Sequence, residues 1–115
     1  MTSDYEQIAS SGMAILVWRE SRVDGMLVFS LDAEELLVEN IAVSPQAQGS
    51  GLGSALLAQA ERIAVKRGKH WVRLYTNEAM VENLAFYPRR GYVETHRGTV
   101  DGYARVYFAK QLALE

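Results

Sequence analysis

The 115-residue sequence contains no cysteine and no long apolar run. The first absence excludes disulfides, thiolate nucleophiles and cysteine metal sites, and we expect no metal. The longest uninterrupted apolar stretch, Met13 to Trp18, is far shorter than the roughly 20 residues of a membrane helix. Residues 1–6 lack the basic start and apolar core of a signal peptide. Together these absences predict a cytoplasmic protein that does not contact a membrane.

The sequence also lacks a strong excess of charge of either sign. Its formal net charge is -2, with acidic and basic residues scattered along the chain, so it offers no basic field for nucleic acid. The composition, 49% hydrophobic and 23% charged, is typical of an ordered globular protein. The length suits one domain, which we expect to span residues 1–115.

Apolar periodicity and turn residues predict strands alternating with helices. Residues 3–9 fit a short helix, and Asp24-Gly25 reads as a turn between two strands. The stretch 35–43 is apolar on both faces, which places it inside the sheet, and a helix joins it to a parallel strand at 70–76. The expected strands are 13–19, 26–30, 35–43, 70–76, 91–96 and 102–110, and the longer expected helices are 51–67 and 78–87. Pro88 should kink or end the second of these helices.

Residues 48–54, here called the glycine loop, lie between the strand that Pro45 ends and the following helix. Gly49, Gly51 and Gly53 have no side chains to keep a ligand from the backbone. The helix start leaves N–H groups unpaired and carries partial positive charge, which favours a phosphate. No lysine follows the last glycine, and Ser54 occupies the third glycine position of the dinucleotide fingerprint, so both common nucleotide motifs are excluded. A pyrophosphate site and a plain turn remain as alternatives.

Two blocks of sequence resemble the GNAT superfamily of N-acetyltransferases. The first is the spacing Val-x-Pro-x-x-Gln-x-x-Gly-x-Gly at Val43, Pro45, Gln48, Gly51 and Gly53, which resembles the family's acetyl-coenzyme A signature. The second is residues 83–92, where a tyrosine, a basic pair and Gly-aromatic follow one another. The order of the expected elements is also that of the family, and the resemblance covers about residues 13 to 110.

The resemblance implies an α/β fold, called α+β in some schemes. It would have a mixed, mostly antiparallel sheet of about six strands with two main helices, lacking the family's first strand and most of its first two helices. Their absence should leave apolar surface uncovered, and we therefore expect a homodimer. Met80 stands where many members have asparagine, so Asn83 is the nearest polar substitute.

The implied activity is acetyl transfer from acetyl-coenzyme A to a primary amine, of a small molecule or a protein, by direct attack in a ternary complex. Tyr87 matches the family's tyrosine and would be the general acid, although it could be a core aromatic. The backbone N–H of Val43 would stabilise the oxyanion. Glu39, expected to share a strand face with Leu37 and Ile41, would be the base, although it could be a solvated or salt-bridged glutamate. Ordered water could replace any base.

The coenzyme contacts implied by the resemblance lie at the end of the central strand, in the glycine loop and in the second helix. They are Ile41, Ala42, Val43, Gln48, Gly49, Ser50, Gly51, Leu52, Gly53, Ser54 and Asn83. Arg89 and Arg90 could reach an adenosine phosphate or form a solvated helix end. The alternatives to an enzyme are an acyl-coenzyme A binding module with a degenerate acceptor site and a structural domain that binds no nucleotide.

Overall fold

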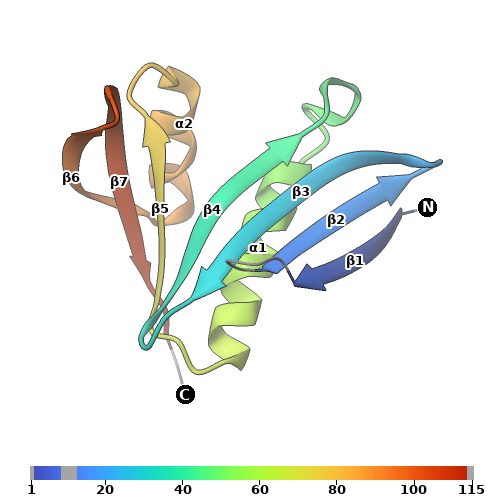
Figure 1. The fold of residues 1–115 in the computed structure, drawn as a ribbon, viewed down its shortest axis with the longest axis horizontal. Coiled ribbons are helices and arrows are strands. Elements are labelled where there is room, and N and C mark those ends of the chain that lie inside the picture. Colours follow the sequence, from blue (N-terminus) through green and yellow to red (C-terminus); the bar gives the residue numbers. More distant parts are fainter. Residues whose placement is uncertain (1, 9–12, 114–115) are drawn as a thin grey trace.

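The structure, a computed structural model, describes residues 2–8 and 13–113. It contains a seven-stranded sheet in the order β1-β2-β3-β4-β5-β7-β6 (Figure 1). The strands are β1 (Thr2–Ile8), β2 (Met13–Arg19), β3 (Arg22–Leu31), β4 (Glu35–Val43), β5 (Trp71–Asn77), β6 (Val93–Val100) and β7 (Tyr103–Gln111). The α-helices are α1 (Leu52–Lys66) and α2 (Val81–Phe86), and short 3-10 turns cover Pro45–Ala47 and Pro88–Arg90. Among the strands of the described residues, only β4 and β5 pair in parallel, so the expected mixed, mostly antiparallel sheet is confirmed.

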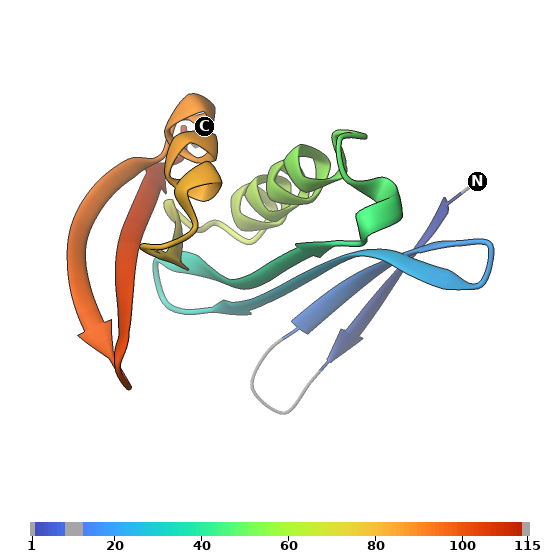
Figure 2. The same ribbon diagram turned by 90° about the horizontal axis from the view of Figure 1, so that it is seen from above.

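Both α-helices lie on one face of the sheet (Figure 2). The core between them and the sheet is built from side chains that alternate along the strands, such as Leu27, Phe29 and Leu36, which are fully buried. Leu57 and Ala60 of α1 close this core from above. The apolar stripe read from the sequence of this helix therefore faces the sheet, as the 3.6-residue period predicts.

The N-terminal segment forms a strand, so the short helix expected at residues 3–9 is wrong for its described part, 3–8. β1 pairs with β2 in an antiparallel register from Thr2 opposite Arg19 to Ile8 opposite Met13. Pairing along the edge of a sheet gives every second backbone group a partner, whereas an isolated helix of two turns is marginal in water. The sheet consequently has one strand more than expected. Ala9 lies outside the described residues.

The turn between β2 and β3 is at Glu20 and Ser21, which have φ values of 51° and 71°, and the turn expected at Asp24-Gly25 is wrong. Asp24 is the extra residue of a bulge, since Val17 pairs with Gly25 and Trp18 pairs with Val23. Gly25 lies under α1, where an added Cβ would be 2.8 Å from Leu52 Cδ2. The glycine at this strand position thus permits close helix packing.

Other expected boundaries hold in outline. The helix expected at 51–67 is α1, and the hairpin at Asp101-Gly102 joins β6 to β7. The helix expected at 78–87 is shorter, because α2 begins at Val81 and gives way to the 3-10 turn that starts at Pro88. Proline has no N–H and crowds the preceding turn, so the helix ends there as predicted.

Candidate active site

A gap opens between β4 and β5 because their pairing stops halfway along β4. The parallel register runs from Glu35 opposite Trp71 to Val38 opposite Leu74 and goes no further. Beyond this point the two strands diverge (Figure 1). A cavity of about 210 Å³ lies in the gap. It is lined by Val38, Glu39, Asn40, Ile41, Leu74, Tyr75, Thr76, Asn77, Met80, Asn83 and Tyr87.

A β-bulge at Glu39 marks the place where the strands separate. Val28 of β3 pairs with Asn40 and the next residue, Phe29, pairs with Val38, so Glu39 is the extra residue. A bulge bends its strand and increases the local twist. It also shifts the side-chain alternation, because Val38 before it and Ile41 after it both pack against the core. The expected shared face of Leu37, Glu39 and Ile41 is therefore wrong.

The glycine loop presents backbone N–H groups that have no acceptor in the part of the chain that the structure describes. Ser50 donates its N–H to Ala47 O over 3.2 Å, and Ala55 donates to Gly51 O over 3.0 Å. The other amides of the loop donate no hydrogen bond to any residue in the described ranges 2–8 and 13–113. They are those of Gln48, Gly49, Gly51, Leu52, Gly53 and Ser54. Such a cluster at the start of a 15-residue helix is chemically suited to a phosphate.

Two glycines in this loop have backbone conformations that other residues resist. Gly49 has φ +81° and Gly51, directly before α1, has φ +86°, and a Cβ on either would meet nothing within 4 Å. Their requirement for glycine is therefore conformational and not steric. At Gly53 an added Cβ would make ordinary contacts with Val43 and Phe86.

The backbone of the last β4 residues faces the gap. Ser44 N donates to Asp24 O over 2.8 Å, and this bond flanks the pair formed by Val43 and Gly25. In an antiparallel ladder a pair flanked in this way exchanges no hydrogen bonds itself. The N–H of Val43 therefore points away from β3 and toward the gap, and the same holds two residues earlier at Ile41.

Tyr87 lies at the wall of the cavity with its ring in the core. Only 8% of the residue is exposed, and its ring makes edge or tilted contacts with Phe86, Tyr92 and Phe108 at centroid distances of 5.2, 6.0 and 5.6 Å. Its hydroxyl makes no hydrogen bond to another described residue. Burial raises the pKa of the Tyr87 phenol above its usual value of 10.0, so the group is protonated at neutral pH and able to donate.

Glu39 lines the same cavity from β4 but differs from the environment expected for it. The side chain is exposed, and within the described part of the chain its carboxylate has neither an ion pair nor a hydrogen bond. The prediction that Glu39 lies among apolar neighbours is therefore wrong, and its proposed role as a base cannot rest on burial. An exposed carboxylate at the mouth of a cavity can instead attract a cationic amine.

Polar groups from β5 and α2 meet on the inner wall of the cavity. Asn83 Nδ2 donates to Thr76 Oγ1 over 3.0 Å, and Thr76 is buried. Met80 Sδ lies 3.7 Å from Asn83 Nδ2. Asn83, which was expected to contact the coenzyme, thus faces the gap. Met80 lines the same cavity next to Asn83.

Arg90 connects the glycine loop to α2. The sequence had left its role open between an adenosine phosphate contact and a solvated helix end. Its Nε and Nη2 donate to Ser54 Oγ over 2.9 and 2.5 Å, and its guanidinium carbon lies 3.7 Å from the centroid of the Phe86 ring. The hydroxyl of Ser54 is therefore occupied within the protein. Arg89, by contrast, is exposed.

Sequence reasoning missed the contribution of the end of β5. Tyr75, Thr76 and Asn77 line the cavity, and none of them was among the site residues expected from the sequence. Topology could have identified these residues. β5 is parallel to β4, and ligands commonly bind beyond the carboxyl ends of neighbouring parallel strands.

Comparison with known proteins agrees with this geometry. Residues 10–94 match the acetyltransferase (GNAT) domain family. The chain belongs to the GNAT acetyltransferase family. It is 30% identical over 73 residues to the uncharacterized protein YxbD of Bacillus subtilis, a match that covers 64% of this chain and 45% of that protein. The chain thus spans less than half the length of this curated relative.

Two solved GNAT structures share the fold. A GNAT family acetyltransferase from Elizabethkingia anophelis with acetyl-CoA bound has a TM-score of 0.81 at 17% identity, covering 96% of this chain and 98% of that one. The ribosomal-protein-S18-alanine N-acetyltransferase of Escherichia coli has a TM-score of 0.79 at 22% identity, covering 93% and 73%. The first shows that a GNAT chain of nearly this extent can hold acetyl-CoA.

The described residues offer neither a metal site nor a membrane-spanning helix. There, no group of at least three histidine, cysteine, aspartate or glutamate side chains is placed to hold a metal ion. Nor does the described part of the chain contain a helix of the length and apolarity needed to cross a membrane.

Proposed function

We propose that this GNAT domain is an N-acetyltransferase that transfers the acetyl group of acetyl-coenzyme A to a primary amine, of a small molecule or a protein, by direct attack in a ternary complex. The observation that carries the proposal is the set of unpaired amides in the glycine loop beside the gap between β4 and β5. The amides of the glycine loop are suited to bind the diphosphate of coenzyme A, and the gap between β4 and β5 is placed to accept its extended pantetheine arm.

The residues that would hold the coenzyme divide between loop and gap. The diphosphate would accept hydrogen bonds from the backbone of the glycine loop, where side-chain identity matters little beyond the glycines. The pantetheine arm would follow the open side of β4 and pass Asn83 on the opposite wall. The proposed contacts are Ile41, Ala42, Val43, Gln48, Gly49, Ser50, Gly51, Leu52, Gly53, Ser54 and Asn83.

Bound acetyl-coenzyme A supplies an acyl carbon activated as a thioester. The amine nitrogen would form a bond to this carbon as the carbon–sulfur bond breaks, and the nitrogen would release one N–H proton to solvent, so that an amide and a free thiol result. The N–H of Val43 is directed at the gap, where it would stabilise the negative oxygen of the transition state. The Tyr87 hydroxyl, which has no other described partner, would protonate the departing sulfur and recover its proton from solvent.

The amine must lose a proton before it attacks, because an aliphatic ammonium group has a pKa near 10. Glu39, exposed at the mouth of the cavity, would attract the ammonium and accept its proton directly or through water. Alternatively, water alone accepts the proton of the ammonium group. A Glu39→Gln variant distinguishes these two routes.

The experiment is a thiol-release assay with acetyl-coenzyme A and a panel of amines. Saturable, amine-dependent release of thiol supports the proposal. Binding of coenzyme A, seen as a rise in melting temperature, without turnover on any amine would support a non-catalytic acyl-coenzyme A binding module. A melting temperature unchanged by coenzyme A would contradict both, since a ligand at about a hundred times its Kd adds about 2.7 kcal/mol of stability.

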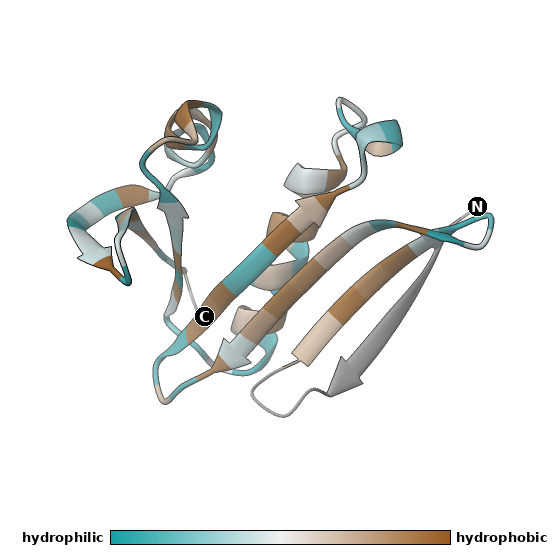
Figure 3. Ribbon diagram, turned by 45° about the horizontal axis from the view of Figure 1, so that its top comes forward, coloured by the Kyte–Doolittle hydropathy of each residue, from teal (hydrophilic) through white to brown (hydrophobic). Residues whose placement is uncertain are grey.

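We also propose that the protein is a cytoplasmic homodimer. The sheet face opposite the helices carries half-buried apolar side chains from β2, β3 and β4, including Leu16, Met26, Val28 and Leu37, and apolar residues concentrate in these strands (Figure 3). A surface of this kind favours association with a second copy. Light scattering at micromolar concentration tests the dimer, and a monomer would contradict it.

A further inference from the structure

The helix-free face of the sheet carries an arginine, beside the cavity, that has no counter-ion among residues 2–8 and 13–113. Arg105 of β7 is half-buried, and its guanidinium carbon lies 4.1 Å from the centroid of the Tyr75 ring. Tyr75 lines the cavity, and so does Asn77, the cross-strand neighbour of Arg105. Two separate contacts therefore place Arg105 at the rim of the gap.

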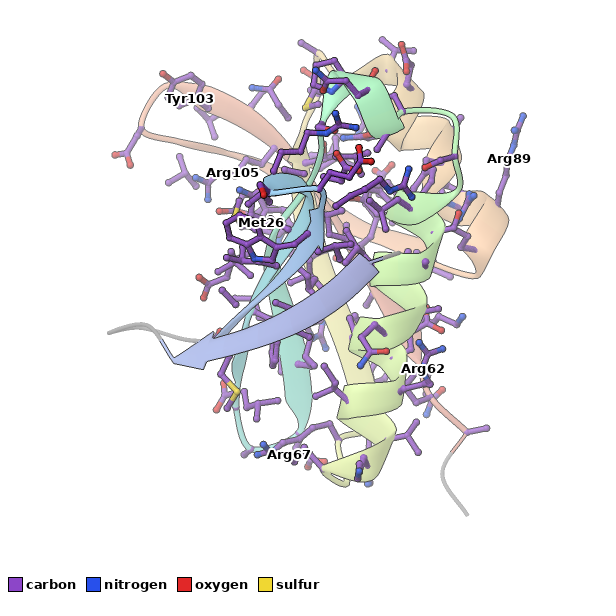
Figure 4. The ribbon with its side chains drawn as sticks, turned by 90° about the vertical axis from the view of Figure 1, so that its right-hand side faces the viewer. Met26, Arg62, Arg67, Arg89, Tyr103 and Arg105 are labelled. Carbon is purple, nitrogen blue, oxygen red and sulfur yellow. The ribbon has the colours of Figure 1, made fainter. Side chains whose placement is uncertain are left out.

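The position of Arg105 is on the side from which an acceptor would approach. Alternation along β5 places Leu74 and Thr76 in the core with α2, whereas Tyr75 and Asn77 point to the opposite face. Figure 4 shows Arg105 and Met26 on this helix-free side of the sheet and Arg62 and Arg89 on the helix side. The glycine loop precedes α1 on the helix side, so Arg105 is not placed to meet the coenzyme diphosphate.

Other arginines of the neighbouring strands are neutralised. Arg73 Nε lies 2.9 Å from Glu35 Oε1, and Arg97 lies 2.9 Å from Glu78 and 3.0 Å from Glu94. Among the described residues, the only interaction partner of the Arg105 guanidinium is the Tyr75 ring. A ring face attracts the cation but accepts few of the five N–H donors of a guanidinium. A ligand with a carboxylate could use those donors in a bidentate contact.

The opposite wall of the cavity carries the complementary charge. Glu39 is exposed, lines the cavity and has no ion pair within the described part of the chain. In the described structure the Arg105 guanidinium contacts the Tyr75 ring and does not pair with Glu39. A carboxylate on the β4 wall and a guanidinium behind Tyr75 at the β5 rim are together complementary to a molecule with an ammonium group at one end and a carboxylate at the other.

We infer that the acceptor is an amino carboxylate, a small amine that also bears a carboxylate, held by Arg105 through the carboxylate and by Glu39 through the ammonium. The inference rests on the proposed function. Arg105 is then a specificity-determining residue for the acceptor, because it contacts the end of the molecule that does not react. A neutral or purely cationic amine of the same size would bind more weakly, since it leaves the guanidinium unpaired.

The first test measures binding without turnover. N-acetyl-L-alanine and N-acetyl-L-alaninamide differ in the carboxylate and carry no ionisable amine, so calorimetric titration of each into the protein with coenzyme A isolates the carboxylate. We expect the acid to bind about tenfold more tightly. Arg105→Gln should remove most of this difference, Arg105→Lys should retain part of it, and Arg62→Gln, an exposed arginine on the helix side, should leave it unchanged.

The second test measures turnover on matched acceptors. Thiol release is compared for L-alanine, β-alanine, 4-aminobutyrate and 6-aminohexanoate against the corresponding amides. A lower KM for the acids, lost in Arg105→Gln with kcat little changed, supports the inference. Turnover of amides and acids with equal KM, or equal binding of the two acetylated probes, would overturn it while leaving the proposed function intact. No thiol release with any amine would refute the proposed function instead.

Discussion

Replacing Gly51 with alanine tests whether the glycine loop works through its backbone. Gly51 has φ +86° directly before α1, and a Cβ there would touch nothing within 4 Å. The substitution therefore adds backbone strain without a clash. An L-residue in this left-handed region costs about 1–2 kcal/mol, which in a domain of this size lowers the melting temperature by about 4–8 °C.

The loop can relieve that strain only by rotating the backbone at residue 51. Rotation would turn the N–H groups of Gly51 and Leu52, which have no acceptor among the described residues, away from their common direction. A hydrogen bond to a charged group contributes about 1.5–3 kcal/mol, so losing one should raise the Kd for coenzyme A by about tenfold or more. Calorimetric titration measures this directly.

Gly102 offers a matched control. It has φ +81°, also with nothing within 4 Å of an added Cβ, and it lies in the hairpin between β6 and β7. Gly102→Ala should show a similar fall in melting temperature with an unchanged Kd for coenzyme A. If Gly51→Ala and Gly102→Ala both bound coenzyme A like the unmodified protein, the glycine loop would not be the diphosphate site.

Four further substitutions give separate expectations. Tyr87→Phe keeps the ring contacts in the core and should lower kcat by about a hundredfold or more with an unchanged coenzyme Kd; full activity would remove the phenol from the mechanism. Gly25→Ala places a Cβ 2.8 Å from Leu52 Cδ2 and should destabilise the protein by about 1–3 kcal/mol in chemical denaturation. An unchanged stability would show that α1 packs loosely enough over β3 to accept the methyl group. Glu39→Gln should raise the KM for the amine and lower kcat if Glu39 is the base, whereas an unchanged kcat would assign that role to water. Asp24→Asn should reduce the loss of stability on acidification, because the carboxylate that is stabilised in the folded state is removed.

The pH dependence expected from Asp24 follows from its surroundings. Its Oδ1 accepts hydrogen bonds from Arg22 Nε over 2.8 Å and from Ser44 Oγ over 3.0 Å. The Arg22 hydrogen bond, supported by Ser44 and Arg19, lowers the pKa of the Asp24 carboxyl below its ordinary value. A depressed folded-state pKa gives stability that is present above the unfolded pKa and is lost as pH falls through the folded value. Thermal melts between pH 7 and about pH 2 should show a smaller decline for Asp24→Asn, and parallel declines would contradict this role.

Local sequence signals predicted the parts of the site that depend on backbone chemistry. Proline restricts its own φ, and glycine readily adopts the positive φ values that other residues resist, so the end of β4, the glycine loop and the end of α2 at Pro88 could be read from the residues. The bulges at Asp24 and Glu39 could not, because a bulge is defined by which residues pair across strands. Asp24 in β3 and Glu39 in β4 were for this reason misplaced, one in a turn and the other on the wrong face.

Long-range partners account for most of the remainder. The strand at residues 2–8 exists because the edge of β2 is available to pair with it, which its own short pattern does not reveal. Arg90 could not be assigned between solvent and the site until Ser54 and Phe86 were seen beside it. The importance of Arg105 likewise depends on the partners that Arg73 and Arg97 have and that Arg105 lacks.

The most direct test of the whole account is a crystal structure of the protein with acetyl-coenzyme A. We predict that the diphosphate oxygens accept hydrogen bonds from backbone N–H groups of residues 48–54 and that the thioester lies in the gap near Val43 and the Tyr87 hydroxyl. A coenzyme bound elsewhere, with the glycine loop empty, would contradict the account.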